Sequence, residues 1–312
     1  MKRLQKTAWA WAIVVIVAFG AGFGVARSTT PKTSTPNDTA AHYPLLAKRI
    51  FIDDPNDTLI NFVALRNKLQ SRFDQVTEKK SFYFEYLPDG TSIRIGADTQ
   101  LVAASLIKVP LVMNLYRAAE LGRVDLAETV TVTDAEVDGA YGDLWKNGAG
   151  YKLTLRQAAQ AALEQSDNTA MHVVFDHVNG LLKPAEQSLE GLDIDQNLEN
   201  GQAVINARSY SSVLKSLYFS SFLQTKDSQE LLGFLSKSSE TNRLTKYLPD
   251  SIAVAHKNGV NNSGQWAESD CGIVYASHRP YIICVMVGLP YDKANDFIAN
   301  VSKDVYDYVS AQ

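Results

Sequence analysis

The sequence predicts an α+β domain, in which both ends of the domain form an antiparallel sheet flanked by helices and the middle forms a helical lobe. Apolar runs typical of strands occur near the start, at 81–86 and 91–95, and near the end, at 251–257, 272–276 and 281–288. Helical periodicity dominates the stretch between them. The chain has 312 residues, of which 46% are hydrophobic, and this is enough to bury a core.

A transmembrane helix is predicted ahead of this domain, over residues 1–26. The chain starts with a basic segment, and residues 7–26 then carry no charge. As a helix this run is roughly 30 Å long, which matches the apolar core of a bilayer. A cleaved signal peptide is the alternative, because Gly24-Val25-Ala26 could be cut. In both cases we expect a cell-membrane protein whose domain lies on the extracytoplasmic side, since the basic flank stays inside.

The domain itself is expected over residues 43–312. Residues 27–42 are rich in Ser, Thr and Pro and predict an extended linker, because such a segment cannot bury apolar surface. The first helix should run from a cap at Asp57 or Thr58 to about Val76. Further helices are expected at 105–122, 154–164, 169–178, 210–219, 229–236 and 294–309.

Two other features limit what the chain can be. Its net charge of −4 gives no basic footprint for nucleic acid, so no nucleic-acid partner is expected. Its five histidines show no metal-ligand grouping. We expect no metal, no organic cofactor and a monomeric chain.

The two cysteines, Cys271 and Cys284, fall on neighbouring predicted strands. A disulfide is conceivable in an oxidising compartment, but two buried free thiols are the favoured interpretation. Residues 185–205 are polar and aperiodic, and no element is predicted there.

The first candidate catalytic motif is Ser105-x-x-Lys108, at the start of a predicted helix. Side chains three apart on a helix share a face, about 5–6 Å apart at Cβ, so the hydroxyl and the amine can meet. A serine needs a base at neutral pH, and a lysine can serve if burial lowers its pKa. The plainer alternative is a solvated lysine one turn after an N-cap serine.

Two more motifs follow in chain order, Ser166-Asp167-Asn168 between two helices and Lys257-Asn258-Gly259 on a predicted strand. The tripeptide at 166 is the most specific, since chance would give on the order of 0.05 copies in such a chain. It could be only an interhelical turn that caps the next helix. The lysine of the third motif could be an ordinary exposed strand residue.

Together the three motifs resemble those of the penicillin-recognising serine hydrolases, the superfamily of class A β-lactamases and penicillin-binding DD-peptidases. The resemblance covers roughly residues 55–312 and implies the β-lactamase/transpeptidase-like fold, with a site between sheet and lobe. It implies that Ser105 is the acylated nucleophile and that Lys108 takes or relays its proton. Ser166 would pass that proton to the leaving nitrogen.

The resemblance also implies how substrate is bound. Asn168 would bind the amide side chain of the substrate, and Lys257 would help to bind its carboxylate. The backbone N–H groups of Ser105 and Val260 would form the oxyanion hole, and Gly259 would let the strand approach the ligand closely.

The chain departs from the family pattern at two places. Asn258 stands where Thr or Ser is usual, so an amide replaces a hydroxyl donor and carboxylate recognition is in doubt. No copy of the Glu-x-x-Leu-Asn element that supplies the deacylation base was found, and Asp195, in Asp195-Gln196-Asn197-Leu198, is the nearest fit. The other candidate carboxylates are Glu186, Glu190, Asp193 and Glu199.

The resemblance therefore predicts an extracytoplasmic serine hydrolase of the class A β-lactamase family that opens β-lactam rings through an acyl-enzyme. One alternative is a DD-carboxypeptidase-like enzyme that acts on peptidoglycan stem peptides. Others are a non-catalytic wall-binding homologue and an esterase on the same scaffold.

Overall fold

The computed structural model of the chain describes residues 60–262 and 265–312. The predicted anchor (1–26), the linker (27–42) and the helix cap at Asp57 or Thr58 lie outside the described residues, as does the predicted start of the domain. Within the described part of the chain, no helix combines the length and the apolar character that a membrane span requires.

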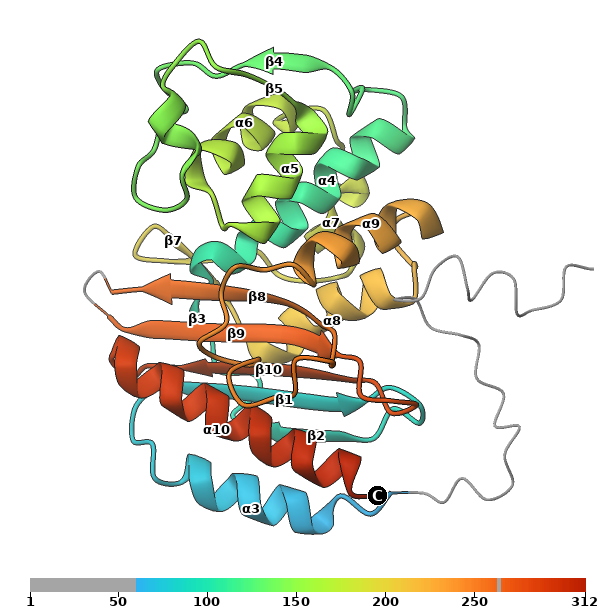
Figure 1. Cartoon of the computed structure of the whole chain (residues 1–312), viewed down its shortest axis with the longest axis vertical. Helices are drawn as coiled ribbons and strands as arrows, with labels where there is room; N and C mark the ends of the chain where they lie inside the picture. Colours follow the sequence, from blue (N-terminus) through green and yellow to red (C-terminus); the bar gives the residue numbers. More distant parts are fainter. Residues whose placement is uncertain (1–59, 263–264) are drawn as a thin grey trace, which may run out of the picture. The chain divides into compact units, whose positions relative to one another are not determined.

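A five-stranded antiparallel sheet forms the base of the domain, in the order β2-β1-β10-β9-β8 (Figure 1). Its strands come from both ends of the domain, as predicted: β1 (Lys80–Tyr86), β2 (Ser92–Ile95), β8 (Val254–Asn261), β9 (Ala267–Val274) and β10 (Tyr281–Val287). The predicted strand 251–257 begins and ends too early relative to β8, and the predicted strand 272–276 begins and ends too late relative to β9. The third motif therefore lies inside β8, on an edge of the sheet.

Side chains of the central strand β10 alternate between two cores, as a sheet covered on both faces requires. Ile282 and Met286 belong to the core beneath the helical lobe, whereas Ile283 and Val285 belong to the core on the opposite face. That opposite face is covered by α3 (Val63–Phe73) and α10 (Tyr291–Ser310) (Figure 1).

The helical lobe is built from the middle of the chain, as expected. Its main helices are α4 (Lys108–Glu120), α5 (Leu155–Glu164), α6 (Asn168–Val178), α8 (Ala207–Tyr218) and α9 (Thr225–Leu235). Short helical turns η1 (Ala104–Ile107), η2 (Leu144–Asn147), η3 (Pro184–Glu186) and α7 (Ser188–Gly191) connect them. Thr154 and Gln157 form a capping box that starts α5, and the Asp167 carboxylate accepts the Ala170 N–H at 2.8 Å and caps α6.

Several short elements were not predicted. They are β3 (Leu101–Val102), β4 (Thr129–Thr131), β5 (Lys152–Thr154), β6 (Asn197–Glu199) and β7 (Gln202–Ile205). Strands of two to four residues are too short to show a hydrophobic period, so the sequence did not reveal them. The expectation that residues 185–205 hold no element was wrong, because β6 and β7 lie there. The first helix also starts later than predicted, at Val63, whose N–H donates to Asn61 Oδ1 at 3.0 Å.

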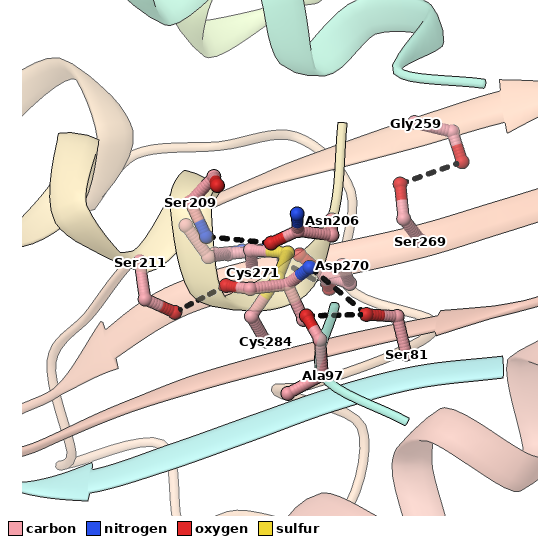
Figure 2. The surroundings of a disulfide bond; sticks show 12 residues. Ser81, Ala97, Asn206, Ser209, Ser211, Gly259, Ser269, Asp270, Cys271 and Cys284 are labelled. Carbon is pink, nitrogen blue, oxygen red and sulfur yellow. Dashed lines mark hydrogen bonds and ion pairs between the residues drawn. A yellow bond between two sulfur atoms is a disulfide. The ribbon is translucent and has the colours of Figure 1, made fainter. Parts of the chain in front are cut away.

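The expectation of two free thiols was also wrong, because Cys271 and Cys284 form a disulfide between β9 and β10 (Figure 2). The two residues are direct partners in the antiparallel register, with Cα atoms 3.9 Å apart. Side chains of such a pair lie on the same face of the sheet and meet. The sequence ranges placed Cys284 on one strand and Cys271 directly before the start of its neighbour, but they did not fix the register that opposes the two residues.

Removal of this bridge should cost stability without loss of the fold. The paired variant Cys271→Ala/Cys284→Ala should unfold with a free energy lower by about 2–3 kcal/mol, since the bridge closes a short loop in the unfolded chain. Urea titration followed by circular dichroism measures the difference. Unreduced, denatured wild-type protein should take up no maleimide, and uptake of two maleimides would contradict the disulfide.

Candidate active site

The candidate nucleophile, Ser105, lies on the turn η1 that joins β3 to α4. The residue before it, Ala104, has φ +46°, in the left-handed region that a side chain with Cβ disfavours. Strain of this kind persists where the surroundings over-determine it and is common at functional sites. The Ala103 N–H donates to Ala203 O at 2.8 Å and ties the turn to β7.

Lys108, one turn further on, is only 1% exposed. Its ammonium donates to the carbonyl oxygen of Ser166, to Ser166 Oγ at 3.3 Å and to Asn168 Oδ1 at 2.7 Å. The Lys108 backbone N–H donates to Ser105 O, but among the described residues no side-chain hydrogen bond joins the Lys108 ammonium to the Ser105 hydroxyl. Lys108 is therefore held by the second motif, directly after the turn that carries Ser105.

Ser166 connects the second motif to the third. Its backbone has φ +54°, which turns its hydroxyl towards both lysines. Ser166 Oγ accepts from Lys257 Nζ at 2.8 Å and lies 3.3 Å from Lys108 Nζ. A hydroxyl has two lone pairs and one proton, so Ser166 can accept from both lysines and still donate its own proton.

Burial sets the protonation of both lysines. Burial lowers the pKa of Lys108 to about 8, against the opposing charges of Asp167 and Asp138. Burial also lowers the pKa of Lys257 to about 7, and the charge of Lys108 adds to the effect. Two such amines can exchange a proton near neutral pH, which exposed lysines cannot do.

The Gly259–Val260 peptide is oriented by groups on the far side of β8. Gly259 O accepts from Arg243 Nη1 at 3.0 Å and from Ser269 Oγ at 3.5 Å (Figure 2). In a trans peptide the N–H points opposite to the carbonyl, so the Val260 N–H points away from β9, at the unpaired edge of the sheet. This is where an oxyanion donor is needed beside the Ser105 turn.

Gly259 itself is required by the close approach of β8 to that turn. A Cβ at this position would lie 2.9 Å from Ala103 O and 3.3 Å from Leu106 Cγ. The glycine thus sets the distance between the two proposed oxyanion donors.

The loop before η2 contributes residues that sequence reasoning missed. Asp138 accepts from Asn168 Nδ2 at 3.2 Å and lies 3.3 Å from His172 Nε2, while Tyr141 O accepts the Asn168 N–H at 3.0 Å. The one signal in the sequence that could have pointed to this loop was its glycine-rich composition. Gly142 has φ +83°, and a Cβ there would meet Asp167 Oδ2 at 2.1 Å.

The candidate deacylation carboxylates fall in different places. Glu186 is paired with Arg123 at 2.6 Å, which lowers its pKa to about 2, and Glu199 is paired with Lys79 at 3.2 Å. Asp195 instead lines a cavity of about 480 Å³ together with Ala103, Leu106 and Ile107, which flank the nucleophile. Glu190 and Asp193 are exposed. The role of Asp195 stays a prediction.

No grouping of three His, Cys, Asp or Glu side chains suited to a metal occurs in 60–262 or 265–312. The described residues around Ser105 offer one hydroxyl nucleophile, two lysines of lowered pKa and a bridging hydroxyl.

Known proteins resemble the chain in both sequence and fold. Residues 64–309 match the model of the family described as "Beta-lactamase enzyme family". The β-lactamase CARB-3 of Pseudomonas aeruginosa is 25% identical over 226 residues, which are 67% of this chain and 77% of that protein. The structure of PBP-A superposes with a TM-score of 0.72 and 22% identity, over 80% of this chain and 97% of PBP-A. A PBP-A mutant, in an acyl-enzyme complex with penicillin G, matches with the same values.

Gly259→Ala should impair acylation of Ser105 by about 100-fold, because the added Cβ pushes β8 away from the turn and separates the two N–H donors. Stopped-flow acylation kinetics with a chromogenic β-lactam or an activated ester measure the rate. Gly233→Ala is the matched control, since Gly233 lies in α9 with no atom within 4 Å of an added Cβ. An unchanged rate in Gly259→Ala would remove this peptide from the site.

Asp138→Asn should shift the pH dependence of acylation. The Asp138 carboxylate raises the pKa of Lys108, so its removal should lower that pKa and move the acidic limb of the rate profile to lower pH by ~0.5 unit. Asp143→Asn, in the same loop but 75% exposed, is the control and should leave the limb in place. If the acidic limb of Asp138→Asn is unchanged, Asp138 does not set the pKa of Lys108.

Proposed function

Because the chain belongs to the β-lactamase enzyme family and is a serine hydrolase, we propose that it opens β-lactam rings through an acyl-enzyme on Ser105. This is the class A type of reaction, and Lys108, Ser166, Asn168, Lys257 and Val260 would take the roles that the motif pattern implies. The observation that carries the proposal is the Ser166 hydroxyl shared by two buried lysines of lowered pKa.

The proposed acylation step uses Lys108, Ser166 and the Val260 N–H. Ser105 Oγ adds to the lactam carbonyl carbon as neutral Lys108 takes the hydroxyl proton. The oxygen of the tetrahedral intermediate accepts from the Ser105 and Val260 N–H groups. When the C–N bond breaks, Ser166 gives its proton to the leaving nitrogen and regains one from Lys108.

Deacylation requires a water molecule, whose oxygen adds to the ester carbonyl and whose proton goes to a base. Glu186 and Glu199 are engaged in ion pairs, which leaves Asp195 as the candidate base at the cavity beside the Ser105 turn. Asp195 is an exposed side chain. We infer slow deacylation, since a missing base typically costs 10²–10⁴-fold.

Slow deacylation also favours a second candidate function. A penicillin-binding DD-carboxypeptidase performs the same acylation on a peptidoglycan stem peptide, and a penicillin remains on its serine. The likeness to PBP-A, a mutant of which is known as a penicillin G acyl-enzyme, is compatible with this alternative.

We further propose that the enzyme acts on the extracytoplasmic side of the cell membrane, held by the predicted anchor at residues 1–26. The Cys271–Cys284 disulfide supports an oxidising compartment, because cytosolic thiols are usually kept reduced.

Intact-mass spectrometry of the full chain in detergent with benzylpenicillin should give an adduct of one penicillin mass that persists. Ser105→Ala should give none. If Asp195 is the base, Asp195→Asn should lengthen the adduct's lifetime by about 10²-fold or more.

Rapid loss of the adduct with accumulation of opened drug would show an efficient β-lactamase and contradict slow deacylation. Turnover of short-chain p-nitrophenyl esters with no penicillin adduct would favour the esterase. Reaction with neither reagent would favour the non-catalytic homologue.

A further inference from the structure

We propose that the cavity beside the Ser105 turn binds the acyl part of the substrate and selects long, uncharged, apolar acyl groups. The inference rests on the proposed acyl transfer at Ser105 and deepens it, because it names the class of acyl group that the site prefers.

The cavity is large and has apolar walls. Its volume is about 480 Å³, roughly three times that of a 150 Å³ apolar cavity that holds benzene. Helices α4 and α6, the segment 187–198 and strand β7 all contribute to its lining. Examples from these walls are Leu111, Met171, Leu189 and Ile205. Such a cavity can remove a sizeable apolar group from water.

The cavity follows α4 away from the nucleophile. Leu106 and Ile107, which come directly after Ser105, line it, and so do Leu111 and Asn114 further along the helix. Residues with this spacing share one face of a helix. The rise from Ile107 to Asn114 is about 10 Å. Since an extended chain advances roughly 1.2 Å per bond, an acyl chain of about eight carbons would span this distance.

The position of the cavity favours the acyl part of the substrate over the leaving group. Ser166, Lys257 and Val260, which are assigned to the leaving group, the carboxylate and the oxyanion, are not among the described residues that line it. Met171 lines it instead, about one turn of α6 after Asn168. The resemblance assigns Asn168 to the amide of the acyl side chain, so the cavity continues from that end of the site.

The polar groups of the walls favour an uncharged occupant. Asn114 Oδ1 accepts the Ser188 N–H at 2.6 Å, and His172 Nε2 lies 3.3 Å from Asp138 Oδ2, so both side chains already have partners. Within the described lining, Asp195 is the one acid and no lysine or arginine occurs. An anionic acyl group would therefore meet a like charge without a compensating cation, which is unfavourable.

Exposed apolar side chains line the same cavity. Leu198 is 74% exposed, Phe175 47% and Ile107 38%. Apolar side chains that gather at an open cavity are typical of a ligand-binding groove. Each CH₂ group that leaves water on binding should raise kcat/KM by up to about fourfold.

The test uses p-nitrophenyl esters of N-acylglycines whose acyl group is acetyl, butanoyl, hexanoyl or octanoyl. Ser105 Oγ would displace p-nitrophenolate from the ester carbonyl, and water would then release the N-acylglycine. The full chain is kept in amphipol, because free detergent would compete for an apolar cavity. After subtraction of the Ser105→Ala rate, kcat/KM should rise about tenfold or more from acetyl to octanoyl. This constant reports acylation, so slow deacylation does not mask the effect.

Two variants assign the effect to the cavity. Met171→Trp fills it and should abolish the octanoyl advantage, with the acetyl constant unchanged within about twofold. Asp176→Trp, exposed on the same helix and outside the lining, is its control. Leu198→Asp puts a charge on the most exposed lining residue of the three and should also reduce the advantage. Val63→Asp, 51% exposed on α3, is the matched control. Both controls should keep the wild-type ratio.

A wild-type constant that does not rise with chain length would overturn the inference, and so would a rise that persists in both cavity variants. If Met171→Trp also loses the acetyl rate, Leu198→Asp decides. Penicillin labelling without a chain-length effect would remove the inference alone. A chain-length effect without penicillin labelling would remove the β-lactam proposal alone. Release from none of the esters would remove acyl transfer at Ser105 and, with it, the inference.

Discussion

Two buried lysines, Lys108 and Lys257, share one hydroxyl, that of Ser166, and the rest of the site is arranged around this contact. Burial of two amines close together costs free energy unless acceptors surround them or a proton is lost. The protein uses both solutions. The Ser166-Asp167-Asn168 turn supplies oxygen acceptors to Lys108, and the pKa values of both lysines fall towards neutrality.

The architecture supplies the places from which these groups meet. Lys257 and the Val260 N–H lie on β8, an edge strand, where one side of the backbone is not used by the sheet. Ser105 and Lys108 stand at the start of α4, and Ser166 lies between α5 and α6. Left-handed backbone at Ala104 and at Ser166 is the local cost of the turns that carry these two serines.

Sequence reasoning recovers what depends on local pattern. The long strands, the capped helices and the three motifs follow from periodicity, capping residues and spacing, and the sheet formed from both ends follows from their order. Sequence reasoning failed where the structure depends on the pairing register of two strands or on a very short element. The opposition of Cys271 and Cys284 depends on how β9 pairs with β10. Tyr141 and Asp138 belong to a loop with no motif, and only the fold brings them to Asn168.

The central claim is that the two lysines titrate far below exposed lysines because they are buried together. Nuclear magnetic resonance of lysine labelled with 13C at Cε follows each ammonium through a pH titration. The account predicts two resonances that titrate at about 8 and about 7, one lost in Lys108→Met and the other in Lys257→Met. Removal of Lys108 should also raise the pKa of Lys257, since the charge of Lys108 lowers it. Titration of every lysine near 10.4, the ordinary value, would contradict the account.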